Sequence, residues 1–482
     1  MTTQVTVPEI GHLIGGEISA AELRDTYDPG RLNEVVARVA VGTAQDVDRA
    51  VRAAHAAFPR WRDTPVAERV QNLLAAVEIV AGSGEELAPL LVREHGGVLW
   101  EAKTDFYLGA GVFQHTVSLA EDFLRPVQFD EEQAFISMEK VPRGVAAAIV
   151  PWNMPVVLTM MKLAPALATG NTMVLKPSPF APAALTLLLN KIAATLPPGV
   201  LNVVHGEGDV GAALCGHPLV RKVAFTGGTA TGQKVIEATA PTLKNFTLEL
   251  GGNDPAIVLD DADIDATIDR MLKGIYTRSG QICFAVKRIY VPRGGYQRFA
   301  DALCDRVNEY AVGHGLDPQA SFGPLNNEAQ FKKVLSLLDQ TRSSSATLVE
   351  LGRKLDPSSW DNGYYMLPYV VRDVDHAAPV SRLEQFGPVV PLIAYDDEEQ
   401  VISWANDSDY GLCSSVWTTD PDRGLKMARR IEAGSTFINS HSFESLDLRM
   451  PFGGVKHSGI GREFDVMGLS AYVEDHAIRW QK

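Results

Sequence analysis

The chain has 482 residues, more than one hydrophobic core usually supports, so the sequence predicts at least two domains. Hydrophobic residues make up 46% and charged residues 21%, the balance of an ordinary globular protein. The formal net charge of −15 argues against nucleic acid and against an anionic membrane surface as partners, because both attract basic faces.

The cysteines are far apart and form no Cys-x-x-Cys pair, which favours neither a zinc site nor a disulfide framework. Four aspartates between residues 260 and 265 are better explained as the solvated start of a helix, so we expect no metal site. The first eight residues show no basic region followed by an apolar run, and no run of about 18 apolar residues appears. We therefore expect neither a secretion signal nor a membrane span, and a cytoplasmic protein.

Residues 1–42 resemble an arm of short strands broken by glycines. Thr43 and Asp46 form a capping box that predicts a helix through Ala57, and Thr64-Pro65 opens a second helix. The apolar residues of this second helix keep helical spacing and are predicted core positions: Val66, Val70, Leu73, Leu74, Val77 and Val80.

From Gly144 onward, short apolar runs alternate with helix-like segments at Val156–Ala168 and Ala181–Leu196. This alternation indicates a parallel sheet with crossover helices, so residues 144–250 are predicted to form a doubly wound α/β domain. The five predicted strands are Val145–Val150, Thr172–Leu175, Leu201–Val204, Lys222–Phe225 and Phe246–Leu250.

Polar and glycine-rich residues follow each of these strands directly. Ligands bind beyond the carboxyl ends of the strands in such sheets, so we expect a site at this edge. The five segments are 151–155, 176–179, 206–208, 226–232 and 249–252.

The α/β pattern begins again after Gly252, with strands expected at Ala256–Leu259 and Arg288–Val291 and helices at Asp263–Leu272 and near Gln297–Tyr310. Residues 252 to about 450 are thus predicted to form a second α/β domain, which carries Cys283. The tail from residue 470 to 480 alternates like an edge strand and is expected to pair with another subunit.

Cys283 is flanked by small and apolar residues, and a free cysteine in such a setting is often a core residue. The motifs around it favour a nucleophile instead. In chain order, these motifs are Pro151-Trp152-Asn153, Lys176-Pro177-Ser178, Phe225-Thr226-Gly227, Leu248-Glu249-Leu250-Gly251-Gly252, Gly280-Gln281-Ile282-Cys283, Glu384-Gln385-Phe386-Gly387-Pro388 and Pro451-Phe452-Gly453-Gly454. The ordered set resembles the aldehyde dehydrogenase superfamily from about residue 28 to the end.

This resemblance implies a doubly wound Rossmann-like cofactor domain (1–125 and 143–251) and a catalytic α/β domain (252–450). It also implies a small β oligomerisation arm (126–142 and 463–482) and a homodimer or homotetramer. The implied reaction is NAD(P)-dependent oxidation of an aldehyde to the carboxylic acid.

The resemblance implies that the Cys283 thiolate adds to the aldehyde carbon and later carries a thioester. The Asn153 side-chain amide and the Cys283 backbone N–H would hold the oxyanion, and Glu249 would activate the hydrolytic water. Lys162 and Glu463 match positions thought to relay protons, although they are equally compatible with a structural ion pair.

For the cofactor, the resemblance assigns Lys176 to the adenosine ribose and Glu384 to the nicotinamide ribose. Pro179 departs from many NAD-preferring relatives, which carry glutamate there, so we expect NAD with NADP tolerated. The remaining cofactor residues are Val150, Pro151, Trp152, Ser178, Gly208, Phe225, Thr226, Gly227, Gly228, Gly232, Leu250, Gln330, Lys333 and Phe386.

The implied substrate tunnel is apolar and partly aromatic, which favours an aromatic or medium aliphatic aldehyde. Its residues are Met154, Leu158, Met161, Ile282, Phe284 and Phe452. Alternatives are an enzyme that passes the acyl group to coenzyme A, a semialdehyde dehydrogenase that uses Arg449, and a cofactor-binding protein without turnover. The 440–450 loop, which includes His441, has no assigned role.

Overall fold

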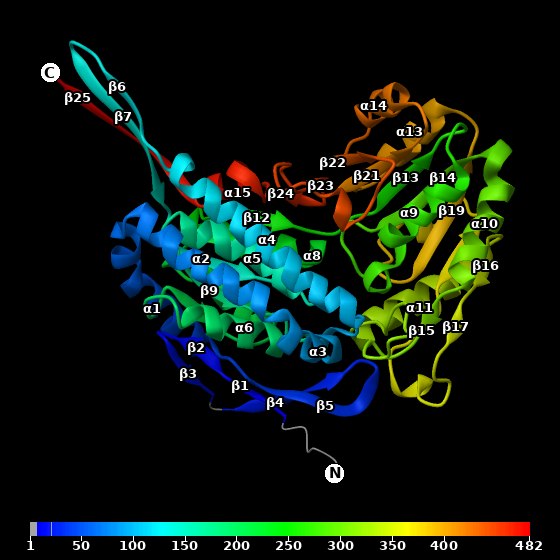
Figure 1. The fold of residues 1–482 in the computed structure, drawn as a ribbon, viewed down its shortest axis with the longest axis horizontal. Coiled ribbons are helices and arrows are strands. Elements are labelled where there is room, and N and C mark those ends of the chain that lie inside the picture. Colours follow the sequence, from blue (N-terminus) through cyan, green and yellow to red (C-terminus); the bar gives the residue numbers. More distant parts are fainter. Residues whose placement is uncertain (1–6, 21) are drawn as a thin grey trace.

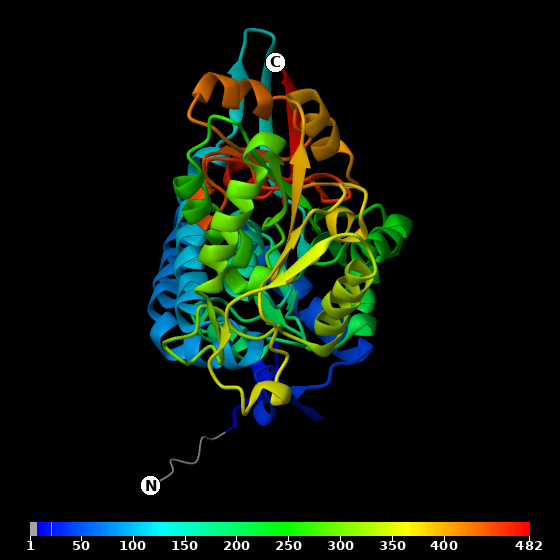
Figure 2. The same cartoon turned by 90° about the vertical axis from the view of Figure 1, so that its right-hand side faces the viewer.

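The computed structural model describes residues 7–20 and 22–482. The expected lack of a secretion signal concerns mainly residues 1–6, which lie outside the described residues. Two lobes lie side by side, and a long β-arm extends from one of them (Figure 1). A view turned by 90° shows the N-terminal strands at the end opposite the arm (Figure 2). No helix in the described ranges is long and apolar enough to cross a membrane.

The first lobe is built on an eight-stranded sheet of order β24-β12-β11-β8-β9-β10-β2-β3. Its five central strands are parallel and confirm the five predicted strands: β8 (Val145–Ile149), β9 (Thr172–Lys176), β10 (Leu201–Val203), β11 (Val220–Thr226) and β12 (Asn245–Glu249). The edges are the antiparallel strands β24 (Gly459–Ile460), β2 (His12–Ile14) and β3 (Glu17–Ser19).

The strand order creates a switch point in this sheet. From β8 the chain proceeds to β9 and β10 on one side, and it then returns to β11 and β12 on the other side. A crevice opens outside the carboxyl ends of the strands where the order reverses, and this is where doubly wound sheets bind ligands. The predicted polar segments at 151–155 and 226–232 therefore adjoin the switch point.

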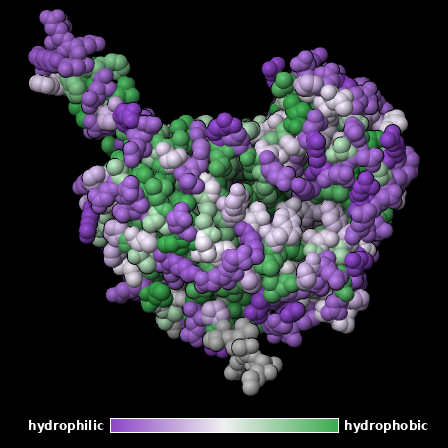
Figure 3. Space-filling model, in the orientation of Figure 1, coloured by the Kyte–Doolittle hydropathy of each residue, from purple (hydrophilic) through white to green (hydrophobic). Residues whose placement is uncertain are grey.

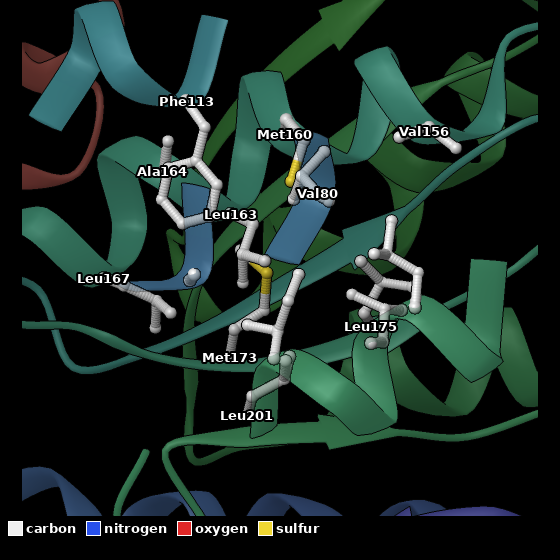
Figure 4. Packing of buried hydrophobic residues seen from close by; sticks show 14 of the residues in the cluster. Val80, Phe113, Val156, Met160, Leu163, Ala164, Leu167, Met173, Leu175 and Leu201 are labelled. Atoms are coloured by element: carbon white, nitrogen blue, oxygen red, sulfur yellow. The ribbon is translucent and has the colours of Figure 1, made fainter. Parts of the chain in front are cut away.

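Helix α5 (Pro155–Ala168) is buried along its whole length, because α4 and α2 cover it on the side away from the sheet. Side chains of these helices pack onto β9 and β10 in the main core of the lobe (Figure 4). The other helices are α1 (Ala44–Asp63), α2 (Val66–Gly82), α3 (Gly84–His95), α4 (Leu99–Phe123), α6 (Ala183–Ala193), α7 (Gly208–Gly216) and α8 (Thr229–Thr239).

The predicted capping box at the start of α1 is confirmed, since the Thr43 hydroxyl accepts from the Asp46 N–H and the Asp46 carboxylate accepts from the Thr43 N–H. Helix α1 continues beyond Ala57 to Asp63. The core prediction for α2 is wrong at Leu74, which is 39% exposed. This residue lies about 100° around the helix from Leu73, whose face contacts the core.

The second lobe is built on a seven-stranded sheet of order β16-β18-β19-β14-β13-β21-β22, parallel except for β16. The predicted strands and helices of this region are confirmed, and Asp263 caps α9 by accepting from the Ala266 N–H. The strands are β13 (Asp254–Val258), β14 (Val286–Pro292), β16 (Thr347–Glu350), β18 (Tyr369–Arg372), β19 (Val389–Tyr395), β21 (Cys413–Trp417) and β22 (Ser435–Ile438). The helices are α9 (Ile264–Tyr276), α10 (Tyr296–Asn308), α11 (Glu328–Arg342), α12 (Pro379–Arg382), α13 (Glu398–Asn406) and α14 (Pro421–Ala428).

Smaller sheets flank the two lobes. The N-terminal sheet contains β1 (Glu9–Ile10), β4 (Leu23–Asp28) and β5 (Arg31–Ala40), and the arm contains β6 (Val127–Asp130), β7 (Ala134–Pro142) and β25 (Val473–Gln481). Two-stranded sheets join β15 (Ala311–Val312) to β17 (Arg353–Lys354) and β20 (Tyr410–Gly411) to β23 (Val455–Lys456). Helix α15 (Asp465–Ser470) precedes β25, and short 3₁₀ helices lie at Ala240–Thr242, Thr277–Gly280, Arg293–Gly295, Trp360–Asn362 and Phe443–Ser445.

The tail is an edge strand, as predicted, but it pairs with β7 of its own chain, from Val473 opposite Pro142 to Gln481 opposite Ala134. Its pairing with another subunit and the domain boundaries stay predictions. Hydrophilic residues cover much of the visible face, in keeping with the net charge (Figure 3).

Candidate active site

Cys283 lies on the loop between the 3₁₀ helix at Thr277–Gly280 and β14. Three successive residues before it, Arg278, Ser279 and Gly280, have positive φ angles of 57°, 57° and 73°. Gly280 is required here, because a Cβ at this position would lie 2.4 Å from the Gly387 carbonyl oxygen. The loop is therefore folded tightly against the second lobe.

Arg278 joins this loop to the first lobe. Its side chain is fully buried, and its Nε donates to the Asn153 carbonyl (3.0 Å) while its Nη2 donates to the His95 carbonyl (3.0 Å). Its backbone N–H donates to Glu101 Oε1 at 2.6 Å. These hydrogen bonds from the buried Arg278 fix the position of the Cys283 loop relative to the loop that follows β8.

Asn153 follows β8, is 4% exposed, and donates from Nδ2 to the Gln281 carbonyl at 2.9 Å. The amide nitrogen carries two hydrogens, so this bond orients the group and leaves one donor free. Asp105 fixes the next turn, because its carboxylate accepts from the N–H groups of Val156 (3.0 Å) and Val157 (2.8 Å) at the start of α5. Met154, just before α5, and Leu158 and Met161 on the helix thereby line a cavity.

Two cavities meet at Cys283. The larger, of about 470 Å³, has mostly apolar walls, and the smaller, of about 210 Å³, lies at the switch point of the eight-stranded sheet. Cys283, Asn153 and Leu158 line both. All six predicted substrate residues line the larger cavity, and further wall residues that the sequence did not single out include Val112, Val157, Phe443, Leu446, Leu448 and Phe464.

Ten predicted cofactor residues line the smaller cavity: Pro151, Trp152, Thr226, Gly227, Gly228, Leu250, Gln330, Lys333, Glu384 and Phe386. The other predicted cofactor residues are not part of its lining: Val150, Lys176, Ser178, Pro179, Gly208, Phe225 and Gly232. Two of the glycines allow close packing, since a Cβ would lie 2.5 Å from Phe225 at Gly227 and 2.6 Å from Leu250 at Gly232.

Glu384 and Phe386 are held on the far wall of the smaller cavity. Glu384 Oε1 accepts from the Gly252 N–H at 3.0 Å, and Gly251 permits this approach, because a Cβ there would lie 2.6 Å from Glu384 Oε2. Gln330 Nε2 donates to the Phe386 carbonyl at 2.9 Å. The Phe386 ring meets Trp152 edge to face at 5.6 Å.

The pKa of the Cys283 thiol is raised to about 12, mainly by burial; the Lys287 charge lowers this pKa, and the neighbouring Glu249 charge contributes to the rise. Lys287 Nζ donates to the backbone carbonyls of Ile282 and Cys283. The thiol of the free enzyme is therefore protonated at neutral pH.

Glu249, at the end of β12, is 3% exposed, and burial followed by the nearby Glu463 charge raises the pKa of its carboxyl well above the usual range. Neither carboxylate oxygen has a hydrogen-bond partner among the described residues, and Glu249 is not part of the lining of either cavity. Gly453 leaves room for it, because a Cβ there would lie 2.6 Å from Oε1.

Lys162 and Glu463 form a buried ion pair at 2.7 Å. The pair acts on Glu249 in opposite directions, since the Glu463 charge raises the pKa of Glu249 and the Lys162 charge lowers it. The contact is the structural ion pair that was one of the two possibilities for these residues. A proton relay through the same two groups stays a prediction.

His441 is buried, and its Nε2 lies 2.7 Å from the Phe284 carbonyl, which only accepts. On its other side, Nδ1 lies 2.9 Å from the Ser415 hydroxyl, which accepts from Trp417 Nε1 at 2.9 Å. Trp417 only donates, so the hydroxyl proton points to Nδ1, and the Nε2–H tautomer of His441 holds the residue after Cys283.

Arg449 is 81% exposed at its side chain, pairs with Asp447, and lies outside the lining of the apolar cavity. The structure thus favours an exposed loop residue over a substrate-binding role for Arg449. The loop contributes instead through Phe443, Leu446 and Leu448, which form part of the cavity wall. Arg278, Lys287 and these loop residues were not predicted from the sequence, where their only signal was a position close to the motifs.

Comparison with solved structures places the fold in a known class. A putative aldehyde dehydrogenase from Burkholderia cenocepacia is 33% identical, with a TM-score of 0.93, over 98% of this chain and 97% of that chain. A betaine aldehyde dehydrogenase from Staphylococcus aureus in complex with NAD+ is 32% identical, with a TM-score of 0.94, over 98% and 95% of the two chains. A glycine-to-aspartate mutant of an aldehyde dehydrogenase from Bacillus cereus is 33% identical, with a TM-score of 0.93, over 98% and 96%.

A family model described as the aldehyde dehydrogenase family matches residues 18–478. The chain belongs to the aldehyde dehydrogenase family and is an enzyme that oxidises aldehydes. The family, fold class and enzyme class predicted from the sequence are therefore confirmed.

Proposed function

We propose that this enzyme uses NAD to oxidise a hydrophobic aldehyde to its carboxylic acid through a covalent intermediate on Cys283. One observation carries the proposal: Cys283 and Asn153 line both the apolar cavity and the cavity at the switch point. A carbonyl group that enters from the apolar side meets the thiol where the second cavity begins. A nucleophile in this position contacts both reactants.

The residues around the smaller cavity suit a dinucleotide. Thr226 Oγ1 is buried without a hydrogen-bond partner in the described chain, and it lines this cavity. Helix α8 begins three residues later, and a helix N-terminus favours a pyrophosphate. Glu384 would hold the nicotinamide ribose, and NAD, when bound, supplies the hydride acceptor. NAD is assigned as the cofactor because the Staphylococcus aureus relative is in complex with NAD+.

In the first step the Cys283 thiol gives its proton to a water molecule and the sulfur bonds to the carbonyl carbon. The π electron pair of the carbonyl group moves to its oxygen, which becomes an oxyanion. The second hydrogen of Asn153 Nδ2 and the Cys283 backbone N–H would bind this oxyanion. Loss of hydride from the carbon then leaves a thioester. Hydrolysis requires a base, and Glu249, whose pKa is raised by burial, would take a proton from the water and release the acid.

Replacing Asn153 by alanine is expected to lower kcat by ~10²–10³, because it removes one donor to the oxyanion. Steady-state kinetics with a good substrate measures this loss. Asn362→Ala serves as the control, since Asn362 is outside the lining of both cavities. A kcat within about twofold of the wild type for Asn153→Ala would refute the oxyanion role.

The substrate assignment follows from the larger cavity. Four phenylalanine rings line it, with Phe284 edge to face against Phe443 (5.0 Å) and Phe452 (5.9 Å). Its volume and apolar walls suit an aromatic or medium aliphatic aldehyde. A quaternary ammonium aldehyde is the second candidate, because aromatic rings attract such cations and Glu78 also lines the cavity.

A panel of benzaldehydes, aliphatic aldehydes and betaine aldehyde, assayed with each cofactor, tests this assignment. We expect kcat/KM for the best uncharged aldehyde to exceed that for betaine aldehyde by at least about tenfold. A discrimination of this size corresponds to the burial of one or two methylene groups in an apolar pocket. The reverse order would establish the cationic substrate. Free acid is the expected product when coenzyme A is present, and acyl-CoA would instead identify the acylating alternative.

We also propose that residues 126–142 and 463–482 form an oligomerisation arm and that the cofactor and catalytic domains divide near residue 252. Seven large apolar side chains of the arm are exposed, namely Val127 (46%), Phe129 (47%), Met138 (44%), Val466 (44%), Met467 (49%), Ile478 (39%) and Trp480 (63%). Such a surface favours burial against a second copy. Analytical ultracentrifugation of the full chain reports whether it forms the expected homodimer or homotetramer, and a monomer would contradict this part of the proposal.

A further inference from the structure

A third cavity, of about 110 Å³, lies beyond the carboxyl ends of β9 and β10. The segments after these two strands line it together with β4 of the N-terminal sheet. Pro179 follows β9, Glu207 follows β10, and Arg24 reaches the same cavity from β4. Arg24 Nη2 pairs with Glu207 Oε1 at 2.6 Å, and both side chains are 55% exposed.

The place of this cavity in the sheet indicates what it would contact. β8 and β9 are adjacent parallel strands, as are the first two strands of a dinucleotide-binding unit. In such units the residues at the end of the second strand select the cofactor: a carboxylate there accepts from the ribose 2′-hydroxyl, and a nearby arginine accommodates a 2′-phosphate. Pro179 provides neither group, so the selecting groups must come from other elements.

Two cationic and two anionic side chains lie together at this end of the sheet, namely Lys176, Arg24, Glu207 and Asp209. Lys176, the last residue of β9, is 5% exposed, and burial lowers its pKa to about 8, while Glu207 and Asp209 raise it and Arg24 lowers it. The charges of Glu207, Asp209 and Arg24 therefore all act on Lys176. A ribose hydroxyl requires only an acceptor, whereas a phosphate requires more positive than negative charge.

We propose that the Arg24–Glu207 ion pair selects between NAD and NADP, which rests on the proposed use of a dinucleotide. Glu207 provides the acceptor for the 2′-hydroxyl that position 179 lacks. Arg24 partly neutralises the charge of Glu207, and its guanidinium group can donate two hydrogen bonds to a 2′-phosphate. Glu207 therefore favours NAD, and Arg24 favours NADP.

The test compares kcat/KM with NADP to kcat/KM with NAD for the same enzyme preparation. This ratio is independent of the folded fraction, because both values fall together when a variant folds poorly. Glu207→Gln is expected to raise the NADP-to-NAD ratio by about tenfold, since it removes a repelling charge while it keeps the shape of the side chain. This change removes no helix cap, because the Glu207 side chain makes no capping bond to α7.

Arg24→Ala is expected to lower the same ratio by about tenfold, because the 2′-phosphate loses its donor and Glu207 is no longer neutralised. Arg38→Ala is the matched control: Arg38 lies on β5 of the same sheet, its side chain is also 55% exposed, and it pairs with Glu9 and Asp25 away from the cavity. The effects of both test variants should weaken at high salt, since the pair is exposed.

Opposite shifts of the ratio in the two variants, with an unchanged ratio in Arg38→Ala, support the inference. Unchanged ratios, or shifts in the same direction, overturn it. A wild-type enzyme that reduces neither cofactor with any aldehyde would refute the proposed function instead, so the two failures are distinguishable.

Discussion

Cys283→Ala is expected to abolish aldehyde-dependent NADH formation, with kcat lowered by roughly 10⁴–10⁶, as removal of a nucleophile does in other covalent enzymes. The proposed reaction has no alternative route, because hydride loss requires the tetrahedral adduct on sulfur. NADH absorbance in steady-state assays measures the loss. NAD binding should persist, since the remaining residues around the smaller cavity are unchanged.

The control for this change is Cys304→Ala, which removes a half-buried thiol on α10 that is outside the lining of both cavities. Its activity should equal that of the wild type. Mass spectrometry of the acid-quenched wild-type enzyme should locate the acyl group on the peptide that contains Cys283. An adduct on any other side chain, or substantial turnover by Cys283→Ala, would disprove the assignment.

Glu249→Gln is expected to slow release of the acid by ~10²–10⁴ and to leave hydride transfer largely intact. The variant should therefore produce a rapid burst of NADH equal to the amount of active enzyme, followed by slow turnover. Stopped-flow absorbance measures the burst and the later phase separately. Glu444→Gln is the control, because Glu444 is an exposed glutamate that pairs with Lys273.

The pH dependence follows from the same carboxyl. Burial raises the pKa of Glu249, so its basic form is scarce at low pH and increases as the pH rises through that raised value. The rate of deacylation in the wild type should rise over this range, and Glu249→Gln should lack the rise. A variant that loses the burst and the later phase equally would show that Glu249 acts before the thioester forms.

Prediction from the sequence succeeded where local pattern decides structure. Apolar runs, cap residues and glycines act over a few neighbouring positions, and they predict the five parallel strands and the capping box at Thr43. The prediction that Leu74 is a core residue failed because its burial depends on tertiary packing and not on local pattern. Helical spacing defines an apolar stripe, but only the packing of α4 and α5 decides how wide its buried part is.

The sequence by itself determined the doubly wound sheet, the strand ends that carry the candidate residues, and the resemblance built on Cys283, Glu249 and Asn153. Only the tertiary structure decided the setting of these groups. Arg278 holds the Cys283 loop by bonds to His95 and Asn153, and Arg24 meets Glu207 across two sheets. These contacts join residues far apart in the chain, and pKa values depend on the burial and charge that such contacts create, which no local pattern records.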